Sequence, residues 1–190
     1  MKKLIKKLLR ENLLYEDTTK EDFFNKHNID ADELSYLGKG DFGTAYSIGD
    51  GRVLKITSSK NEFEIAKSLV GKYNVPALDG IVDFYVAETV DGEGMIIMEE
   101  LDEDSSIEDL FYELHNYLDE QGLPIQYLDN LDIDELDLSD EMHDFINDLD
   151  DIIRGYRYIG IEASDIKPDN MGRDKNGKLK AFDIDDRDRR

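Results

Sequence analysis

The 190-residue sequence predicts an α+β fold, in which a small antiparallel sheet with one helix is followed by a mainly helical part. Glycines separate short apolar runs between residues 34 and 57, which is typical of consecutive strands joined by tight turns. After Leu101 the sequence becomes acidic, and its apolar residues recur at helical spacing. We therefore expect a sheet-containing unit before Leu101 and a helical unit after it.

Composition restricts the classes of function. The 46 acidic and 23 basic residues give a net charge of −23, which repels phosphate backbones and anionic lipids. Nucleic acid is therefore not expected as a partner. The acidity itself serves solubility, attracts a basic protein or mimics nucleic acid. The absence of cysteine excludes disulfides, thiolate zinc sites and a cysteine nucleophile. No apolar run reaches the roughly 18 residues of a membrane span, and the N-terminus has no secretion signal, so we expect a cytoplasmic protein without integral membrane association.

Residues 1–33 are expected to form an N-terminal helical extension. The first 14 residues predict a basic amphipathic helix, which either anchors the protein to a membrane or partner or, as we favour, docks on its own acidic body. Thr18 or Thr19 is placed to cap a second short helix that runs towards His27 and serves packing. The apolar face of the first helix comprises Leu4, Ile5, Leu8, Leu9 and Leu13.

The sheet-containing unit is predicted to have five strands and one helix. Residues 34–57 predict three antiparallel strands with a turn at Gly49-Asp50-Gly51. Residues 61–72 then show helical periodicity, with Gly71 near the end. Two further strands are expected at residues 81–89 and 94–100, joined by the turn Asp91-Gly92-Glu93.

The helical unit is predicted to hold two long helices around an acidic connector. Ser105 or Ser106 can cap a helix that continues to about Glu120, and Ser139 can cap another that continues to about Tyr158. Residues 119–140 between them are rich in Asp and Glu. A solvated loop is the interpretation we favour there, because the spacing and central glycine of a calcium-binding EF-hand are absent.

The first candidate motif is a glycine-rich turn between two predicted strands, Leu37-Gly38-Lys39-Gly40-Asp41-Phe42-Gly43. Glycines allow backbone amides to approach phosphates without interference from a Cβ atom. The strand expected after the turn argues against a dinucleotide-binding fold, which requires a helix there. A glycine-rich hairpin with no ligand remains the alternative.

The second candidate is Lys55, at the end of Val53-Leu54-Lys55 on the third predicted strand. A lysine on a buried strand needs an anionic partner, and the following helix offers Glu62 or Glu64. Such a pair could be purely structural, or it could hold Lys55 towards phosphates.

The third candidate is the segment Asp165-Ile166-Lys167-Pro168-Asp169-Asn170, followed by Asp183. The interval contains a predicted hairpin, with its turn at residues 174–177 and its second strand at 179–182, which could bring Asn170 and Asp183 together. Magnesium is usually held by one or two carboxylates and by substrate phosphates, so this pair suits Mg²⁺.

Taken in order, these elements make residues 34–185 similar to the eukaryotic-type protein kinases, particularly those specific for serine and threonine. The resemblance implies a two-lobe fold, with a kinase-like N-lobe at 34–101 and a reduced C-lobe at 102–190 that ends just after the metal-binding aspartate. It also implies an ATP- and magnesium-dependent phosphotransferase that acts on a protein hydroxyl. The expected partners are therefore ATP and a protein substrate, or a basic protein.

The resemblance also implies a role for each matched residue. Asp165 would accept the proton of the substrate hydroxyl and Lys167 would steady the γ-phosphate, while Asn170 and Asp183 would hold magnesium. Lys55, oriented by Glu62, would contact the α- and β-phosphates. The remaining nucleotide-binding positions would be Gly38, Gly40, Phe42, Gly43, Val53, Met98, Glu99 and Leu101.

The sequence departs from the family in three places. Ala163-Ser164 stands where the family has His-Arg, and Ile184-Asp185 stands where it has Phe-Gly, so control by an activation-loop phosphate is not expected. Arg190 leaves no room for the usual peptide-docking helices. We therefore expect the N-terminal helices, a partner chain or a homodimer to cover the apolar residues of 142–153.

Two alternatives follow from these departures. One is a pseudokinase that serves as an acidic interaction module, although the retained Lys55, Asp165, Asn170 and Asp183 argue against it. The other is a kinase for a cationic small molecule, although the D-x-K-P-x-N loop is more similar to the protein kinases.

Overall fold

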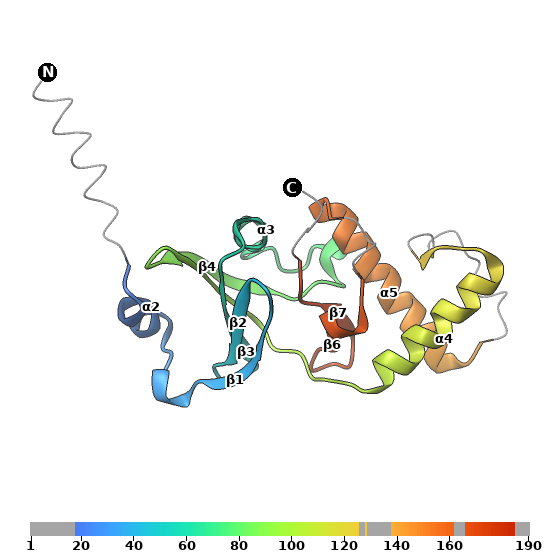
Figure 1. Cartoon of the computed structure of the whole chain (residues 1–190), viewed down its shortest axis with the longest axis horizontal. Coiled ribbons are helices and arrows are strands. Elements are labelled where there is room, and N and C mark those ends of the chain that lie inside the picture. Colours follow the sequence, from blue (N-terminus) through green and yellow to red (C-terminus); the bar gives the residue numbers. More distant parts are fainter. Residues whose placement is uncertain (1–17, 126–127, 129–137, 162–165, 185–190) are drawn as a thin grey trace, which may run out of the picture.

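The computed structural model describes residues 18–125, 128, 138–161 and 166–184. Within them it shows the expected α+β architecture, with a five-stranded antiparallel sheet, a two-stranded hairpin and four α-helices (Figure 1). The helix predicted at residues 1–14 lies outside this part of the chain, as does most of the acidic connector. Among the described helices, none is both long and apolar enough to cross a bilayer.

The five strands follow the order β1-β2-β3-β5-β4, and each pairs antiparallel with its neighbours. The turn between β2 and β3 has positive φ angles at Gly49 (79°), Asp50 (54°) and Gly51 (68°), which explains the Gly-Asp-Gly sequence. Asp91 and Gly92 form a two-residue hairpin turn between β4 and β5, also with positive φ angles. The strands are β1 (Ser35–Lys39), β2 (Gly43–Ser47), β3 (Arg52–Thr57), β4 (Phe84–Val90) and β5 (Glu93–Glu99).

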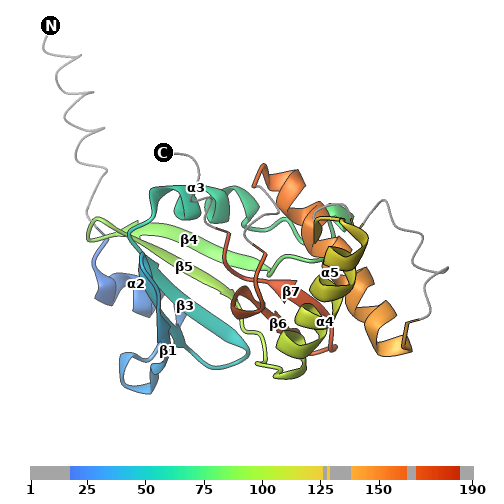
Figure 2. The ribbon, with the colours of Figure 1, turned by 45° about the vertical axis from the view of Figure 1, so that its right-hand side comes forward.

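Helices cover both faces of the sheet (Figure 2). Successive side chains of each strand point to opposite faces, so each strand contributes to both contacts. Helix α3 (Lys60–Leu69) packs on the face that contains Val53 and Ile96. Helix α2 (Lys20–His27) buries Phe23 against the other face, beside Leu54. The capping box between Thr19 and Asp22 starts α2, as the sequence predicts.

Two boundaries in the sheet-containing unit differ from the prediction. Helix α3 ends at Leu69 rather than at residue 72, because Val70 leaves helical geometry and Gly71 has a φ of 75°. Strand β4 starts at Phe84 rather than at residue 81, because Ile81 and Val82 bond to another part of the chain.

The helical unit contains α4 (Ser106–Gln121) and α5 (Asp140–Ile159), close to their predicted ranges. Ser139 caps α5 through its side chain, whereas the first turn of α4 is capped by Asp104, which accepts a hydrogen bond from the Ser106 N–H at 2.9 Å. The predicted connector at 119–140 starts too early, because its first three residues belong to α4. After α5 come the short helix η6 (Pro168–Asn170) and the hairpin of β6 (Met171–Arg173) and β7 (Leu179–Ala181).

The expectation that N-terminal helices, a partner or a homodimer cover residues 142–153 is wrong for the described part of the chain. The apolar residues of this stretch are buried within the chain, where α5 contacts α4, β7 and the short helix η2 (Pro76–Leu78). Helix α2 lies instead on the sheet. Helix α5 is thus buried against elements that the sequence had not indicated as its neighbours.

The β6–β7 hairpin is held at two places, by the segment before β4 in the sheet-containing unit and by Asp102 at the junction of the two units. Ala181 donates its N–H to the carbonyl of Gly80 at 2.9 Å and accepts from the N–H of Val82 at 3.0 Å. Asp102 and Arg173 exchange a pair of backbone hydrogen bonds at 2.8 and 3.0 Å. These bonds fix the position of the residues after β7 relative to the sheet.

Gly80 provides a test of this junction. A Cβ atom at this position would lie 2.3 Å from the Ile152 backbone nitrogen in α5, so Gly80→Ala should lower the free energy of unfolding by about 1–3 kcal/mol or more. Gly38→Ala is the matched control, because its Cβ would meet nothing within 4 Å, and its effect should stay within about 0.5 kcal/mol. Urea unfolding of both variants measures the difference, and equal stabilities would contradict the close approach.

The ion pair of Asp104 and Arg173 predicts a pH-dependent contribution. The Arg173 guanidinium, 2.6 Å away, and the Ser106 N–H lower the pKa of Asp104 from 3.8 to about 2. A lowered pKa stabilises the fold above pH 4, and this contribution is lost as the pH falls towards 2. Asp104→Asn should therefore cost about 1–2 kcal/mol at pH 7, allowing for partial exposure.

The difference between wild type and Asp104→Asn should shrink below pH 4, as measured by urea unfolding across pH. Glu103→Gln, at an exposed neighbouring position, should change little at any pH. A cost for Asp104→Asn that does not vary with pH would show that the ion pair is not its source.

Candidate functional site

Lys55 and Glu62 form an ion pair between the sheet and α3. Lys55 lies on β3 opposite Ile96, and its Nζ contacts Oε1 of Glu62. Glu62 is in the first turn of α3, where its N–H donates to the Ser59 hydroxyl at 3.2 Å. Of the two glutamates considered from the sequence, Glu62 is therefore the partner, and Glu64 is exposed.

The Glu62 carboxylate is buried, and its negative charge must therefore be stabilised by groups of the protein. Glu62 is only 2% exposed, and the loss of solvation raises its pKa above 4.5. The Lys55 ammonium opposes this rise, and so does the hydroxyl of Thr57, which donates to Oε2 of Glu62 at 2.7 Å. The carboxylate therefore has a different partner on each oxygen.

Asp183 is the second acidic group near Lys55, with 3.8 Å between its Oδ1 and the lysine Nζ. The hydroxyl of the buried Tyr156 in α5 donates to the Asp183 carbonyl at 2.8 Å and fixes the backbone there. The next residue back, Phe182, donates its N–H to the Asn170 carbonyl at 3.0 Å. The chain segments that carry Asn170 and Asp183 thus lie side by side, as the predicted hairpin requires.

An Asn–Asp pair suits a magnesium ion that is also bound by phosphates. Among the described residues, no group of three or more His, Cys, Asp or Glu side chains could hold a metal on its own. Asn170 and Asp183 would therefore need oxygen ligands from a nucleotide or water to complete a magnesium site.

Packing requires a glycine at only one of three positions in the glycine-rich segment between β1 and β2. A Cβ atom on Gly43 would lie 2.4 Å from the Ile56 carbonyl oxygen. Packing against β3 is therefore enough to require glycine at this position. Gly38 and Gly40 have no neighbour within 4 Å of such an atom, and packing does not explain them. The space beside both glycines is open, although the Gly40 N–H already donates to the Gly43 carbonyl at 2.9 Å.

The expected adenine-binding positions lie where β3 and β5 end. Val53 and Met98 face each other across the two strands and are both buried. The N–H of Glu99 donates to the Asp83 carbonyl at 2.9 Å, so its carbonyl is the group left to consider for adenine. The Glu99 carboxylate pairs with Lys180 at 2.7 Å, and Leu101 is half-buried.

The catalytic-loop candidates are described only in part. Lys167 is exposed just before η6, and Asn170 ends that short helix. Asp165 lies outside the described residues, so the role expected for it stays a prediction.

Sequence reasoning missed two hydroxyl groups at this site, those of Thr57 and Tyr156. The sequence does indicate that both hydroxyls need a hydrogen-bond partner, because Thr57 ends a buried strand and Tyr156 lies on the apolar face of a helix. The identity of those partners depends on tertiary contacts that the sequence does not reveal.

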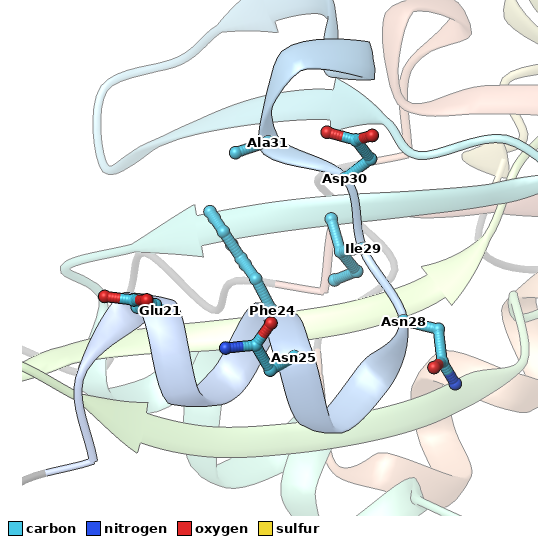
Figure 3. A pocket seen from close by; sticks show the side chains of 7 residues that line it. All are labelled: Glu21, Phe24, Asn25, Asn28, Ile29, Asp30 and Ala31. Carbon is cyan, nitrogen blue, oxygen red and sulfur yellow. The ribbon is translucent and has the colours of Figure 1, made fainter.

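Two hollows occur away from this site. One, of about 620 Å³, lies beside α2, and Figure 3 shows Phe24 and Ile29 among its lining residues. The other, of about 210 Å³, is lined by charged residues that include Asp83, Lys178 and Lys180. Neither of these two hollows is lined by Lys55, Glu62 or Asp183.

Comparison with known proteins does not add to this geometry. No family model matches the chain, and the search of curated proteins finds no significant match. The motifs and their arrangement in the fold are therefore the features that indicate a function.

Removing one member of the ion pair should destabilise the protein. Glu62→Ala leaves a partly buried lysine without its nearest carboxylate, at an expected cost of about 2–3 kcal/mol in the free energy of unfolding. Glu64→Ala, in the same helix but exposed, should stay within about 0.5 kcal/mol. Thermal and urea unfolding compare the two, and similar costs would contradict the pairing.

Proposed function

We propose that the protein is an ATP- and magnesium-dependent phosphotransferase that acts on a serine or threonine hydroxyl of a protein. The observation that supports this most strongly is the grouping of Lys55, Glu62 and Asp183. These residues come from a strand, a helix and the segment after the β6–β7 hairpin, and Lys55 lies within 4.0 Å of both acids. The resemblance to protein kinases had implied that all three belong to one nucleotide site.

Each residue would have a defined task. Lys55 would bind the α- and β-phosphates, and its pairing with Glu62 would keep the ammonium directed into the site. Gly38 and Gly40 would let backbone N–H groups approach the phosphates, while Val53 and Met98 would pack against adenine. Asn170 and Asp183 would hold magnesium, which supplies charge neutralisation on the phosphates when bound.

Transfer itself would require little covalent chemistry from the protein. Asp165 would orient the acceptor hydroxyl and take its proton, and Lys167 would steady the γ-phosphate. The contribution of the fold is to hold these groups relative to one another. The hairpin bonds to Gly80 and Asp102 support that role, because they restrain the segment that carries Asp183.

One observation favours a second candidate, a non-catalytic module that binds a basic protein. No Lys or Arg occurs between Lys72 and Arg154, although this stretch includes all of α4, most of α5 and many acidic residues. Such a one-signed surface attracts cationic partners. The same charge would equally serve a kinase whose protein substrate is basic.

Ligand-dependent stability tests the nucleotide site. ATP with magnesium at 100 times its dissociation constant should raise the free energy of unfolding by about 2.7 kcal/mol, and ATP without magnesium should give less. Asp183→Asn should remove most of the magnesium-dependent part, whereas Asp109→Asn, on an exposed position of α4, should not. No stabilisation of the folded wild type would reject the proposal and favour the binding module.

Catalysis is tested separately through Asp165. Asp165→Asn should abolish transfer of labelled γ-phosphate to an arginine- and lysine-rich test protein while leaving ATP binding within about threefold of wild type. Calorimetry and the transfer assay measure the two effects. Unchanged transfer in this variant would contradict the role assigned to Asp165.

A further inference from the structure

A buried hydroxyl group lies between the glycine-rich turn and the Lys55–Glu62 pair. Thr57 is the last residue of β3, pairs with Gly43 of β2 and Gly94 of β5, and is 2% exposed. A hydroxyl at such a position must make hydrogen bonds within the protein, because burial without them is costly.

The hydrogen bonds of Thr57 define its direction. Its Oγ1 lies 2.7 Å from Oε2 of Glu62 and 3.0 Å from the Ser59 N–H, which donates to it. The Phe42 carbonyl is farther away, at 3.4 Å. Because a hydroxyl has one proton, we assign the donated bond to Glu62, the nearer and charged acceptor.

This bond fixes the orientation of the Glu62 carboxylate. Oε1 contacts Lys55 while Oε2 accepts from Thr57, so the carboxylate cannot rotate without losing one of the two. Among the described residues, the other acid that pairs with Lys55 is Asp183, with 3.8 Å between its Oδ1 and the lysine Nζ. A loosened Glu62 would let the lysine shift towards Asp183, the residue proposed to hold magnesium.

The same short turn also holds the end of the glycine-rich segment. The Phe42 carbonyl accepts from the N–H of Ser58 at 2.7 Å and from its hydroxyl at 2.9 Å. Thr57, Ser58 and Ser59 thus contact the glycine-rich turn, the Glu62 side chain and the start of α3. Three consecutive residues connect all the elements that would surround the phosphates on the sheet side.

We propose that Thr57 is a positioning residue of the nucleotide site: its hydroxyl fixes Glu62 so that Lys55 points to the phosphates and not to Asp183. This inference rests on the proposed function, because it assigns Thr57 a part in ATP binding. It adds to the ion pair a residue that does not touch the nucleotide and that no motif in the sequence had indicated.

The binding test compares two substitutions at Thr57 with a control. Thr57→Val keeps the shape and removes the hydroxyl, so it should weaken the affinity for magnesium-ATP by about 5- to 30-fold, the effect of losing one or two kcal/mol of hydrogen bonding to a charged group. Thr57→Ser retains the hydroxyl and should stay within about threefold of wild type. Thr89→Val, an exposed threonine on β4, is the matched control and should not change the affinity.

Calorimetry with magnesium-ATP, well below the melting temperatures of the variants, measures these affinities without interference from a change in stability. Wild-type affinity in folded Thr57→Val would overturn the proposal. Equal weakening in Thr57→Ser and Thr57→Val would also overturn it, because packing and not the hydroxyl would then be responsible.

A second measurement does not depend on nucleotide binding. With ¹³C-labelled glutamate at pH 7, the side-chain carboxyl resonance of Glu62, assigned through Glu62→Gln, should move in Thr57→Val and return towards its wild-type position in Thr57→Ser. If wild type does not bind magnesium-ATP, the proposed function fails, and this resonance alone decides whether Thr57 holds Glu62. An unmoved resonance would overturn that role.

Discussion

The cost of placing the Lys55 ammonium on a largely buried strand is the constraint on which the rest of the site depends. A charge in such a position must be paired, and the pair is stable only if both partners have their remaining hydrogen bonds. Glu62 meets this requirement because Ser59, the N-cap of α3, comes only two residues after the end of β3, which places the first turn of α3 next to the lysine. The start of α3, the end of β3 and the turn between them are therefore determined together.

The β6–β7 hairpin extends this constraint to the helical unit. Its backbone bonds to Gly80, Val82 and Asp102 hold the segment after β7 against the sheet, and Tyr156 fixes the Asp183 carbonyl from α5. A carboxylate that belongs to a different part of the chain is thereby kept close to Lys55. Such restraint suits the nucleotide site that we propose, because preorganised groups need little rearrangement when a ligand enters.

The sequence predicted elements well where local chemistry decides them. The Gly-Asp-Gly turn, the Thr19 cap of α2 and the Ser139 cap of α5 follow from residue types at fixed offsets, and the structure confirms all three. The structure also confirms Glu62 as the ion-pair partner of Lys55. Prediction was poorer where contacts between distant segments determine the structure. Strand β4, for example, starts later than predicted because the residues before it bond to Ala181.

The packing of α5 also depends on contacts between distant segments that the sequence does not reveal. Its apolar face was apparent in the sequence, but the elements that cover it were misjudged, because periodicity tells which side of a helix is buried and not what lies against it. The hydroxyls of Thr57 and Tyr156 were missed for a related reason. Their partners come from α3 and from the segment after β7, which only the tertiary structure places next to them.

The central claim, that a nucleotide binds between the glycine-rich turn and Asp183, is tested most directly by hydrogen–deuterium exchange with a non-hydrolysable ATP analogue and magnesium. The account predicts that slower exchange is concentrated at residues 38–43, at 99–101 and around Asn170 and Asp183. Protection that appears instead around residues 21–31, beside the larger hollow, or at none of these segments, would contradict it.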